Sequence, residues 1–92
     1  MAKLSNDEIT TALASLPGWS RAGDTLTKTY TFATFPNGIS FVDRVAVAAE
    51  EMGHHPDMTI TYTRVTMTLA THDEGGVTQK DVTLAQRIDA LA

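Results

Sequence analysis

The chain is organised around the stretch EEMGHHPD, residues 50–57, where an apolar helical run ends and a strand-like run begins. Gly53 fits a helix C-terminal cap, and Pro56 fixes the direction in which the chain leaves the corner. Adjacent histidines cannot share one face of a helix or a strand. His54 and His55 therefore suit a turn, where both rings can point into one cleft. Histidine is also the side chain whose unperturbed pKa, about 6.5, permits proton transfer near neutrality.

Apolar residues at helical spacing predict three helices around this corner. The first covers about residues 5–15 and begins at a capping box formed by Ser5 and Glu8. The second runs from about residue 35 to residue 52. It is apolar on so much of its circumference that it needs cover on two sides, from the sheet and from a helix of the same chain or of a second subunit. The third follows a second capping box at residues 78–81 and continues to about residue 91.

Alternation with period two predicts four strands. A short strand is expected at residues 19–21, and a longer one at residues 25–32, with threonines on its outer face. Lys28 interrupts the inner face of the longer strand, so we expect it near a sheet edge or with its stem buried and its ammonium group at the surface. The apolar phase shifts by one at Arg64, which predicts a tight turn near residues 63–64 and a hairpin of about 58–62 and 65–71.

The predicted order is helix, two strands, helix, two strands, helix. Two hairpins in one four-stranded antiparallel sheet, with helices packed on one face, define an α+β fold. Residues 1–92 are expected to form a single domain. Because the chain has no cysteine, disulfides and thiolate metal sites are excluded, which leaves packing and oligomerisation to stabilise so small a domain.

Charge and hydropathy exclude two classes of partner. The net charge is −4, with 11 acidic and 7 basic residues and no cluster of Lys or Arg, so direct nucleic-acid binding is not expected. No apolar run approaches membrane-spanning length, and the first residues lack a signal-peptide core. We expect a cytoplasmic protein.

The residues able to carry chemistry are Glu50, His54, His55, His72 and Asp81. Glu50 and His54 lie four residues apart, so the end of the helix can bring their side chains together. Each candidate also has a structural reading: a helix cap for His54, an exposed loop position for His72, and capping alone for Asp81. Three histidines suggest a zinc site, but the adjacent pair lacks the spacing of common zinc motifs, so we expect no metal.

Taken together, these residues resemble the signature of a known family. The run Glu50-x-x-x-His54-His55-Pro56, followed by Tyr62, His72 and Asp81, is similar to that of the pterin-4a-carbinolamine dehydratases. Further matches span residues 4–91: LPGW at 16–19, FxxRVA at 41–46, TH at 71–72 and DxxLA at 81–85. The resemblance implies a four-stranded antiparallel sheet with helices on one face, assembled as a dimer or tetramer.

The resemblance implies loss of water from a 4a-hydroxytetrahydropterin, giving a quinonoid dihydropterin in tetrahydrobiopterin recycling. This dehydratase reaction needs an acid and a base and no cofactor. It implies that His54 and His72 transfer the protons and that His55 orients the pterin or shares the acid role. Glu50 would set the charge or tautomer of His54, and Asp81 would orient His72 or His55.

Further residues are implied to contact the pterin: Gly53, Thr71 and Asp73. Met58 stands where many members of the family carry an aromatic residue, which bears on substrate fit rather than on proton chemistry. The alternative function is non-catalytic, either pterin binding or a dimerisation and transcription-cofactor role that uses the second helix. The expected partners are a pterin and further copies of the chain.

Overall fold

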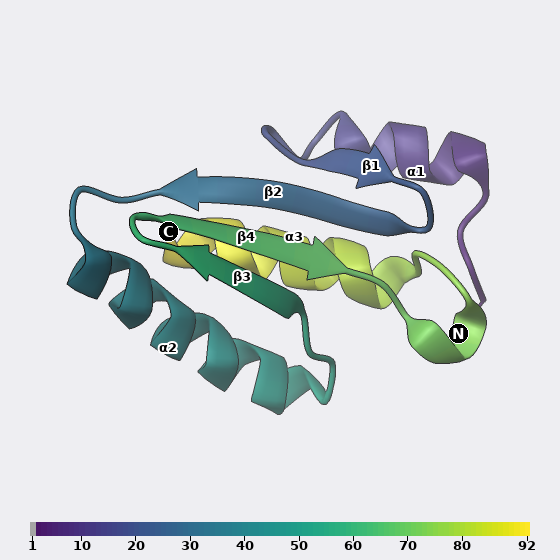
Figure 1. Ribbon diagram of the computed structural model, residues 1–92. Coiled ribbons are helices and arrows are strands. Elements are labelled where there is room, and N and C mark those ends of the chain that lie inside the picture. Colours follow the sequence, from purple (N-terminus) through teal and green to yellow (C-terminus); the bar gives the residue numbers. More distant parts are fainter. Residues whose placement is uncertain (1) are drawn as a thin grey trace.

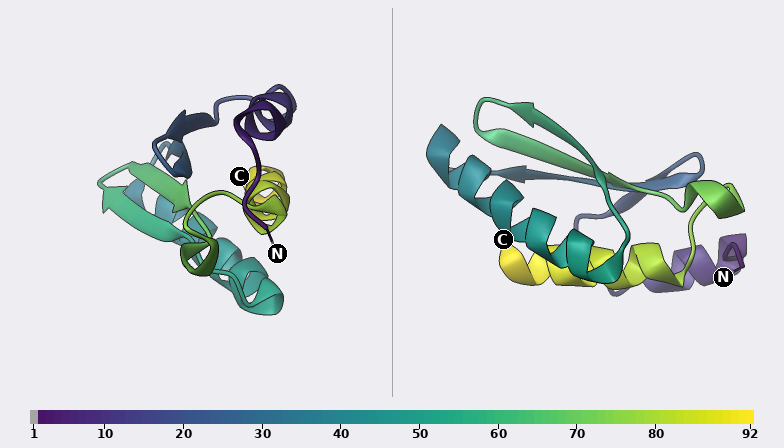
Figure 2. Two further views of the ribbon diagram at one scale, coloured as in Figure 1. Left: turned by 90° about the vertical axis from the view of Figure 1, so that its right-hand side faces the viewer. Right: turned by 90° about the horizontal axis from the view of Figure 1, so that it is seen from below.

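Four antiparallel strands form one sheet, and three helices cover one of its faces (Figures 1 and 2). The computed structural model describes residues 2–92. The elements are α1 (Asn6–Leu13), β1 (Ser20–Ala22), β2 (Thr25–Thr31), α2 (Phe35–Met52), β3 (Asp57–Thr61), β4 (Arg64–Leu69), a one-turn 3₁₀ helix η1 (His72–Glu74) and α3 (Gln79–Leu91). The strand order is β1-β2-β4-β3, so the two hairpins meet through β2 and β4. The expected fold class and element order are confirmed.

Side-chain caps fix the helix ends that the sequence predicts. The Ser5 hydroxyl accepts a hydrogen bond from the Glu8 amide at 3.1 Å, and the Glu8 carboxylate accepts one from the Ser5 amide at 2.8 Å, a complete capping box. Helix α2 ends at Met52 and is capped by Gly53, which has φ +60 and ψ +30, a left-handed conformation that glycine adopts without strain. Among residues 2–92, no helix combines the length and the apolar character needed to cross a bilayer.

The core lies between the sheet and helices α2 and α3. Phe41 of α2 is fully buried, with its ring centroid 4.8 Å from that of Tyr30 and 5.1 Å from that of Phe32. The other side of α2 faces α3 of the same chain, where the Arg87 guanidinium binds the Glu51 carboxylate at 2.6 Å. A helix of the same chain therefore provides the second cover that α2 requires.

The β3–β4 hairpin accounts for the shift in apolar phase. Ile60 pairs with Val65, and Thr61 pairs with Arg64, so Tyr62 and Thr63 form a two-residue turn. This pairing places the apolar residues of both strands on the helix-covered face. The turn lies one residue earlier than expected, and β4 ends at Leu69 rather than at residue 71, because the chain then bends into η1.

Asp89 of α3 accepts hydrogen bonds from three donors, which lie in the first hairpin and in the segment before it. Its Oδ1 accepts hydrogen bonds from the Trp19 indole at 3.0 Å, from the Lys28 ammonium at 2.9 Å and from the Tyr30 hydroxyl. Lys28 also donates to the Pro17 carbonyl at 2.8 Å. In the described chain β1 pairs with residues 25–27 of β2, so Lys28 lies just past the end of β1, near a locally open edge of the sheet as expected, and its charge reaches Asp89 over the face of the Tyr30 ring.

This cluster shifts the pKa values of two of its members in opposite directions. For Asp89, partial burial opposes ionisation, but the hydrogen bonds from Tyr30, Lys28 and Trp19 outweigh it and lower the pKa of the carboxyl. For Tyr30, burial first, and then the neighbouring Asp89 carboxylate, raises the pKa of the phenol. The folded state therefore favours an ionised Asp89 and a neutral Tyr30.

We expect Asp89→Asn to lower the free energy of unfolding by about 1–2 kcal/mol at neutral pH, because the three donors lose a charged acceptor. A lowered folded-state pKa stabilises the fold above the unfolded value of about 3.9 and loses that effect as pH falls through the folded value. The difference between wild type and variant should thus shrink below about pH 4.

Urea unfolding from pH 7 to pH 3 measures this difference. Gln86→Ala, an exposed position on the same helix, is the control and should cost little at any pH. A difference for Asp89→Asn that matches the control, or that stays constant with pH, would contradict the assigned role.

Candidate active site

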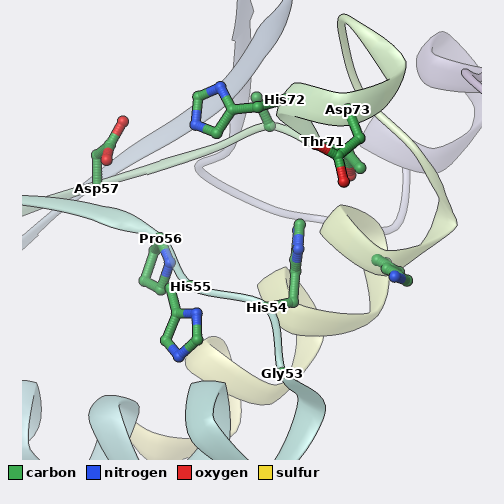
Figure 3. Close-up of a pocket in the computed structure, with 10 residues that line it drawn as sticks. Gly53, His54, His55, Pro56, Asp57, Thr71, His72 and Asp73 are labelled. Carbon is green, nitrogen blue, oxygen red and sulfur yellow. The ribbon is translucent and has the colours of Figure 1, made fainter.

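The candidate site forms where β3 begins and β4 ends. Asp57, the first residue of β3, pairs with Thr68 near the end of β4, so the loop after α2 and the segment entering η1 meet at one corner. A cavity of about 380 Å³ lies between them, within the usual size range of small-molecule sites. It is lined by Gly53, His54, His55, Pro56, Asp57, Ala70, Thr71, His72, Asp73 and Lys80 (Figure 3). The structure thus brings all three histidines to one cavity.

His54 is held by a carboxylate from α3. The left-handed Gly53 turns the chain back over the helix end, and the His54 amide donates to the Ala49 carbonyl at 3.1 Å. The His54 side chain is 11% exposed, and its Nε2 lies 2.6 Å from Oδ1 of Asp81, whose side chain is fully buried. Two ordered helix ends, the C-terminus of α2 and the N-terminus of α3, therefore fix this ring.

Hydroxyl and amide donors complete the environment of the Asp81 carboxylate. Its Oδ2 accepts from the Thr71 hydroxyl at 2.9 Å and from the Thr78 amide at 2.8 Å. Because the single Thr71 proton goes to Asp81, the 2.8 Å contact between the Thr71 and Thr78 hydroxyls must be donated by Thr78. The donors thus follow one direction, from Thr78 to Thr71 to Asp81.

This arrangement selects a tautomer of His54. A carboxylate only accepts hydrogen bonds, so the neutral His54 ring donates to Asp81 through Nε2–H. The lone pair then lies on Nδ1, which is the nitrogen left for a substrate. His54 is therefore arranged to accept a proton at Nδ1, and Asp81 is placed to stabilise the imidazolium that results.

The carboxylate partners of the histidines differ from those expected. The Glu50 carboxylate binds Nε2 of His55 at 2.7 Å, whereas Glu50 was expected beside His54. The four-residue spacing fails because the helix ends at Met52 and the left-handed Gly53 reverses the chain. His54 then faces α3, and the His55 ring is directed toward α2 (Figure 3). Both members of the His55–Glu50 pair are more than half exposed, so the pair adds little stability.

Asp81 likewise binds neither of the histidines first expected to be oriented by it. Its two oxygens accept from His54, Thr71 and Thr78, and neither His72 nor His55 is among its partners. His72 is the first residue of η1 and is exposed, on a different element from His54 (Figure 3). Within residues 2–92, no hydrogen bond from another side chain holds its ring.

The remaining expected contacts, Gly53, Thr71 and Asp73, all line the cavity. Sequence reasoning missed Asp57 and Lys80, which line the cavity as well, and Thr78, whose backbone amide donates a hydrogen bond to Asp81. Asp57 directly follows the HHP segment and Lys80 precedes Asp81 in the capping box, so adjacency to the chosen motifs was the available signal. In the part of the chain that the structure describes, no group of three or more His, Cys, Asp or Glu side chains is placed to hold a metal ion.

The fold and the corner define a class of protein: a small open α+β sheet with a histidine-lined cavity suited to acid–base chemistry. Comparison with known proteins is more specific. The family model described as pterin 4 alpha carbinolamine dehydratase matches residues 2–91. The chain belongs to the pterin-4a-carbinolamine dehydratase family.

Individual relatives agree with this assignment over nearly the whole chain. Proteins named "Putative pterin-4-alpha-carbinolamine dehydratase" from Thermomicrobium roseum and Nocardia farcinica are 48% and 52% identical, over 100% and 97% of this chain and 99% and 94% of their own. A crystal structure from Brucella melitensis, described as a transcriptional coactivator/pterin dehydratase, superposes with a TM-score of 0.95 at 36% identity, covering 98% of both chains. A pterin dehydratase-like protein described as a RuBisCO assembly factor of the alpha-carboxysome gives a TM-score of 0.66 at 29% identity, over 80% of this chain and 86% of its own.

We expect Asp81→Asn to switch the tautomer of His54. The one remaining carbonyl oxygen of the amide would keep accepting from Thr71 and Thr78, and its NH₂ group would then donate to His54 Nε2, which moves the ring proton to Nδ1. The variant should also lose about 1–3 kcal/mol of stability, because a buried charged acceptor becomes neutral.

Long-range ¹H–¹⁵N correlation spectra of the histidine rings, recorded where the rings are neutral, distinguish the two tautomers. Glu50→Gln is the matched control, since it alters the partner of His55 and should leave the His54 signals in place. An unchanged Nε2–H tautomer in Asp81→Asn would show that Asp81 does not set the state of His54.

Proposed function

We propose that this chain is a hydro-lyase that removes water from a 4a-hydroxytetrahydropterin to give a quinonoid dihydropterin, as a step in tetrahydrobiopterin recycling. The observation that carries the proposal is that His54, paired with a fully buried carboxylate, and His72, whose ring has no side-chain partner among residues 2–92, line the same cavity. Membership of the dehydratase family supports the same reaction. Two imidazoles in different hydrogen-bonding environments are suited to act as one acid and one base.

In the proposed reaction, His72 acts in its protonated form and delivers a proton to the 4a-hydroxyl group. The C4a–O bond breaks, and its electron pair leaves with the water. His54 accepts the N5 proton through Nδ1, and the electrons of the N5–H bond form the C4a=N5 double bond. Each ring then exchanges one proton with solvent before the next turnover.

Other cavity residues are proposed to bind and orient the pterin. His55, restrained by Glu50, would contact one edge of the ring system, and Thr71 and Asp73 would offer polar contacts near His72. The exposed backbone at Gly53 would allow close approach of the ligand, since the residue carries no side chain. The acid and base steps proposed here use protein side chains and call for no cofactor.

We expect His54→Ala and His72→Ala each to lower the rate of dehydration by about 10²–10⁴-fold, because each removes one general acid or base. The reaction is started with chemically generated 4a-hydroxytetrahydropterin and followed by the absorbance of the quinonoid product. Each rate is compared with that of the uncatalysed reaction.

Asp43→Ala, an exposed acid on α2 outside the cavity, is the matched control and should keep the wild-type rate. Circular dichroism confirms that each variant is folded. Near-normal turnover in either histidine variant would remove that residue from the mechanism, and a wild-type rate equal to the uncatalysed one would leave pterin binding without catalysis.

A second proposal concerns association, the feature that a non-catalytic module would use. Large apolar side chains are exposed on α2, at Phe35 and Val47, and on the second hairpin, at Ile60 and Tyr62. In the sheet formed by the described residues, β3 is the last strand and pairs with β4, so its other edge is open to another strand. We propose that the chain forms homo-oligomers through these surfaces, alongside the dehydratase activity.

We expect Val47→Glu and Ile60→Glu each to weaken self-association by about tenfold or more, since a charge would be placed in an apolar contact. Sedimentation velocity across a range of protein concentrations measures the change. Gln86→Glu, at an exposed polar position of α3, is the control and should not alter it. A wild-type chain that remains monomeric at all concentrations would contradict the proposal.

A further inference from the structure

A second cavity lies on the far side of His72 from the first. Its volume is about 240 Å³, and it is lined by Asp24, Thr25, Ala70, His72, Gly75 and Gly76. Ala70 and His72 line both cavities, so the two are neighbours separated by the start of η1. The proposed dehydratase mechanism uses the first cavity and gives the second no role.

The walls of the second cavity are fixed by the sheet. Leu26 pairs with Leu69, so the turn between β1 and β2 is held beside the chain that leaves β4. Figure 1 and the right-hand view of Figure 2 both show this turn next to η1. A Cβ placed on Gly76 would meet the Lys3 side chain first, with its Cδ at 2.7 Å, and the Asp24 Cβ at 3.9 Å, so Asp24 lies near the glycine segment beside the Lys3 stem.

The cavity offers hydrogen-bond acceptors. Asp24 is exposed, and within residues 2–92 no hydrogen bond or ion pair occupies its carboxylate. The Thr25 hydroxyl gives its proton to the Ala22 carbonyl at 2.7 Å and so keeps only lone pairs for a ligand. A ligand group matched to this wall carries hydrogen-bond donors, and a carboxylate can accept from two neighbouring hydroxyls at once.

The chemistry of the proposed substrate connects the two cavities. In a 4a-hydroxytetrahydropterin the reacting atoms are C4a and N5, and C6 is bonded directly to N5. If His72 and His54 serve C4a and N5, a substituent at C6 begins one bond away from the reacting atoms. Such a substituent would have to pass His72, which with Ala70 lines both cavities, to enter the second one.

We infer that the second cavity is a specificity subsite for a short hydroxylated side chain at C6 of the pterin, with Asp24 accepting hydrogen bonds from adjacent hydroxyls. This inference rests on the proposed dehydratase function. It assigns Asp24 to substrate selection and not to the proton transfers, so it predicts an effect that depends on the substituent.

The test compares two substrates, one with a 1,2-dihydroxypropyl group and one with a methyl group at C6. We expect Asp24→Ala to lower kcat/KM about tenfold for the diol substrate and to leave the methyl substrate within about twofold of wild type, because only the diol loses hydrogen bonds. Asp24→Asn, which keeps one acceptor oxygen, should give an intermediate loss. Asp43→Ala, which removes an equally exposed carboxylate on α2, should leave the ratio of the two substrates unchanged.

The subsite proposal is wrong if Asp24→Ala keeps the wild-type ratio of kcat/KM between the two substrates, or if it lowers kcat/KM equally for both. If wild type turns over neither substrate, the dehydratase proposal fails, and the subsite is decided by equilibrium binding of the two corresponding 7,8-dihydropterins. Tighter binding of the diol compound that is lost about tenfold in Asp24→Ala would support the subsite without catalysis. Equal affinity of both compounds in wild type and variant would exclude it.

Discussion

The buried carboxylate of Asp81 is the constraint on which the candidate site depends. A charged group with no exposure to solvent is costly unless donors surround it, and here an imidazole, a hydroxyl and a backbone amide do so. One of these donors is the N-terminal amide of a helix, whose dipole also favours a negative charge. The same contacts cap the N-terminus of α3, hold the segment before η1 against that helix and orient the His54 ring. Local folding and the state of the ring are therefore set by one side chain.

Helix α3 carries a second carboxylate two turns further along, and the two have different tasks. Asp89 draws Trp19, Lys28 and Tyr30 toward the end of α3 that lies away from the cavity. It therefore fixes the helix against the first hairpin, while Asp81 fixes it against the loops of the second. Contacts near both ends of α3 thus restrain its position on the sheet and its packing beside the end of α2. The contact between His54 and Asp81 depends on that packing.

Local signals in the sequence predicted most of the fold. The capping boxes, Gly53 and the phase shift at Arg64 each reflect interactions between residues close in the chain, and the structure confirms the elements that they delimit. The corner itself was also predicted, because a helix end followed by a hairpin must turn there. The position of Lys28 was left open between an edge and a buried stem, since strand order is not a local property.

The partners within the site were less predictable. Glu50 and His54 have the right spacing for a continuous helix, and one left-handed residue between them redirects the second side chain. Asp81 reaches His54 across 27 positions in the chain, a contact that depends on how α2 and α3 pack. Similarly, the second cavity joins a turn near residue 24 to a glycine segment near residue 75, and only the β2–β4 register brings them together. Sequence patterns therefore predicted which side chains belong to the site, whereas tertiary packing determines which of these side chains contact one another.

The proposed chemistry and the proposed self-association use separate parts of this fold. The cavity is built from loops and helix ends, while the exposed apolar side chains include Val47 within α2 and Ile60 within β3. Changes at one location therefore need not disturb the other, which is how one scaffold supports different functions. The relatives fit this view: one is described as both coactivator and dehydratase, and a more distant one as an assembly factor. Overall similarity to either shows the family, and the His54–Asp81 pair beside His72 is what argues for catalysis in this chain.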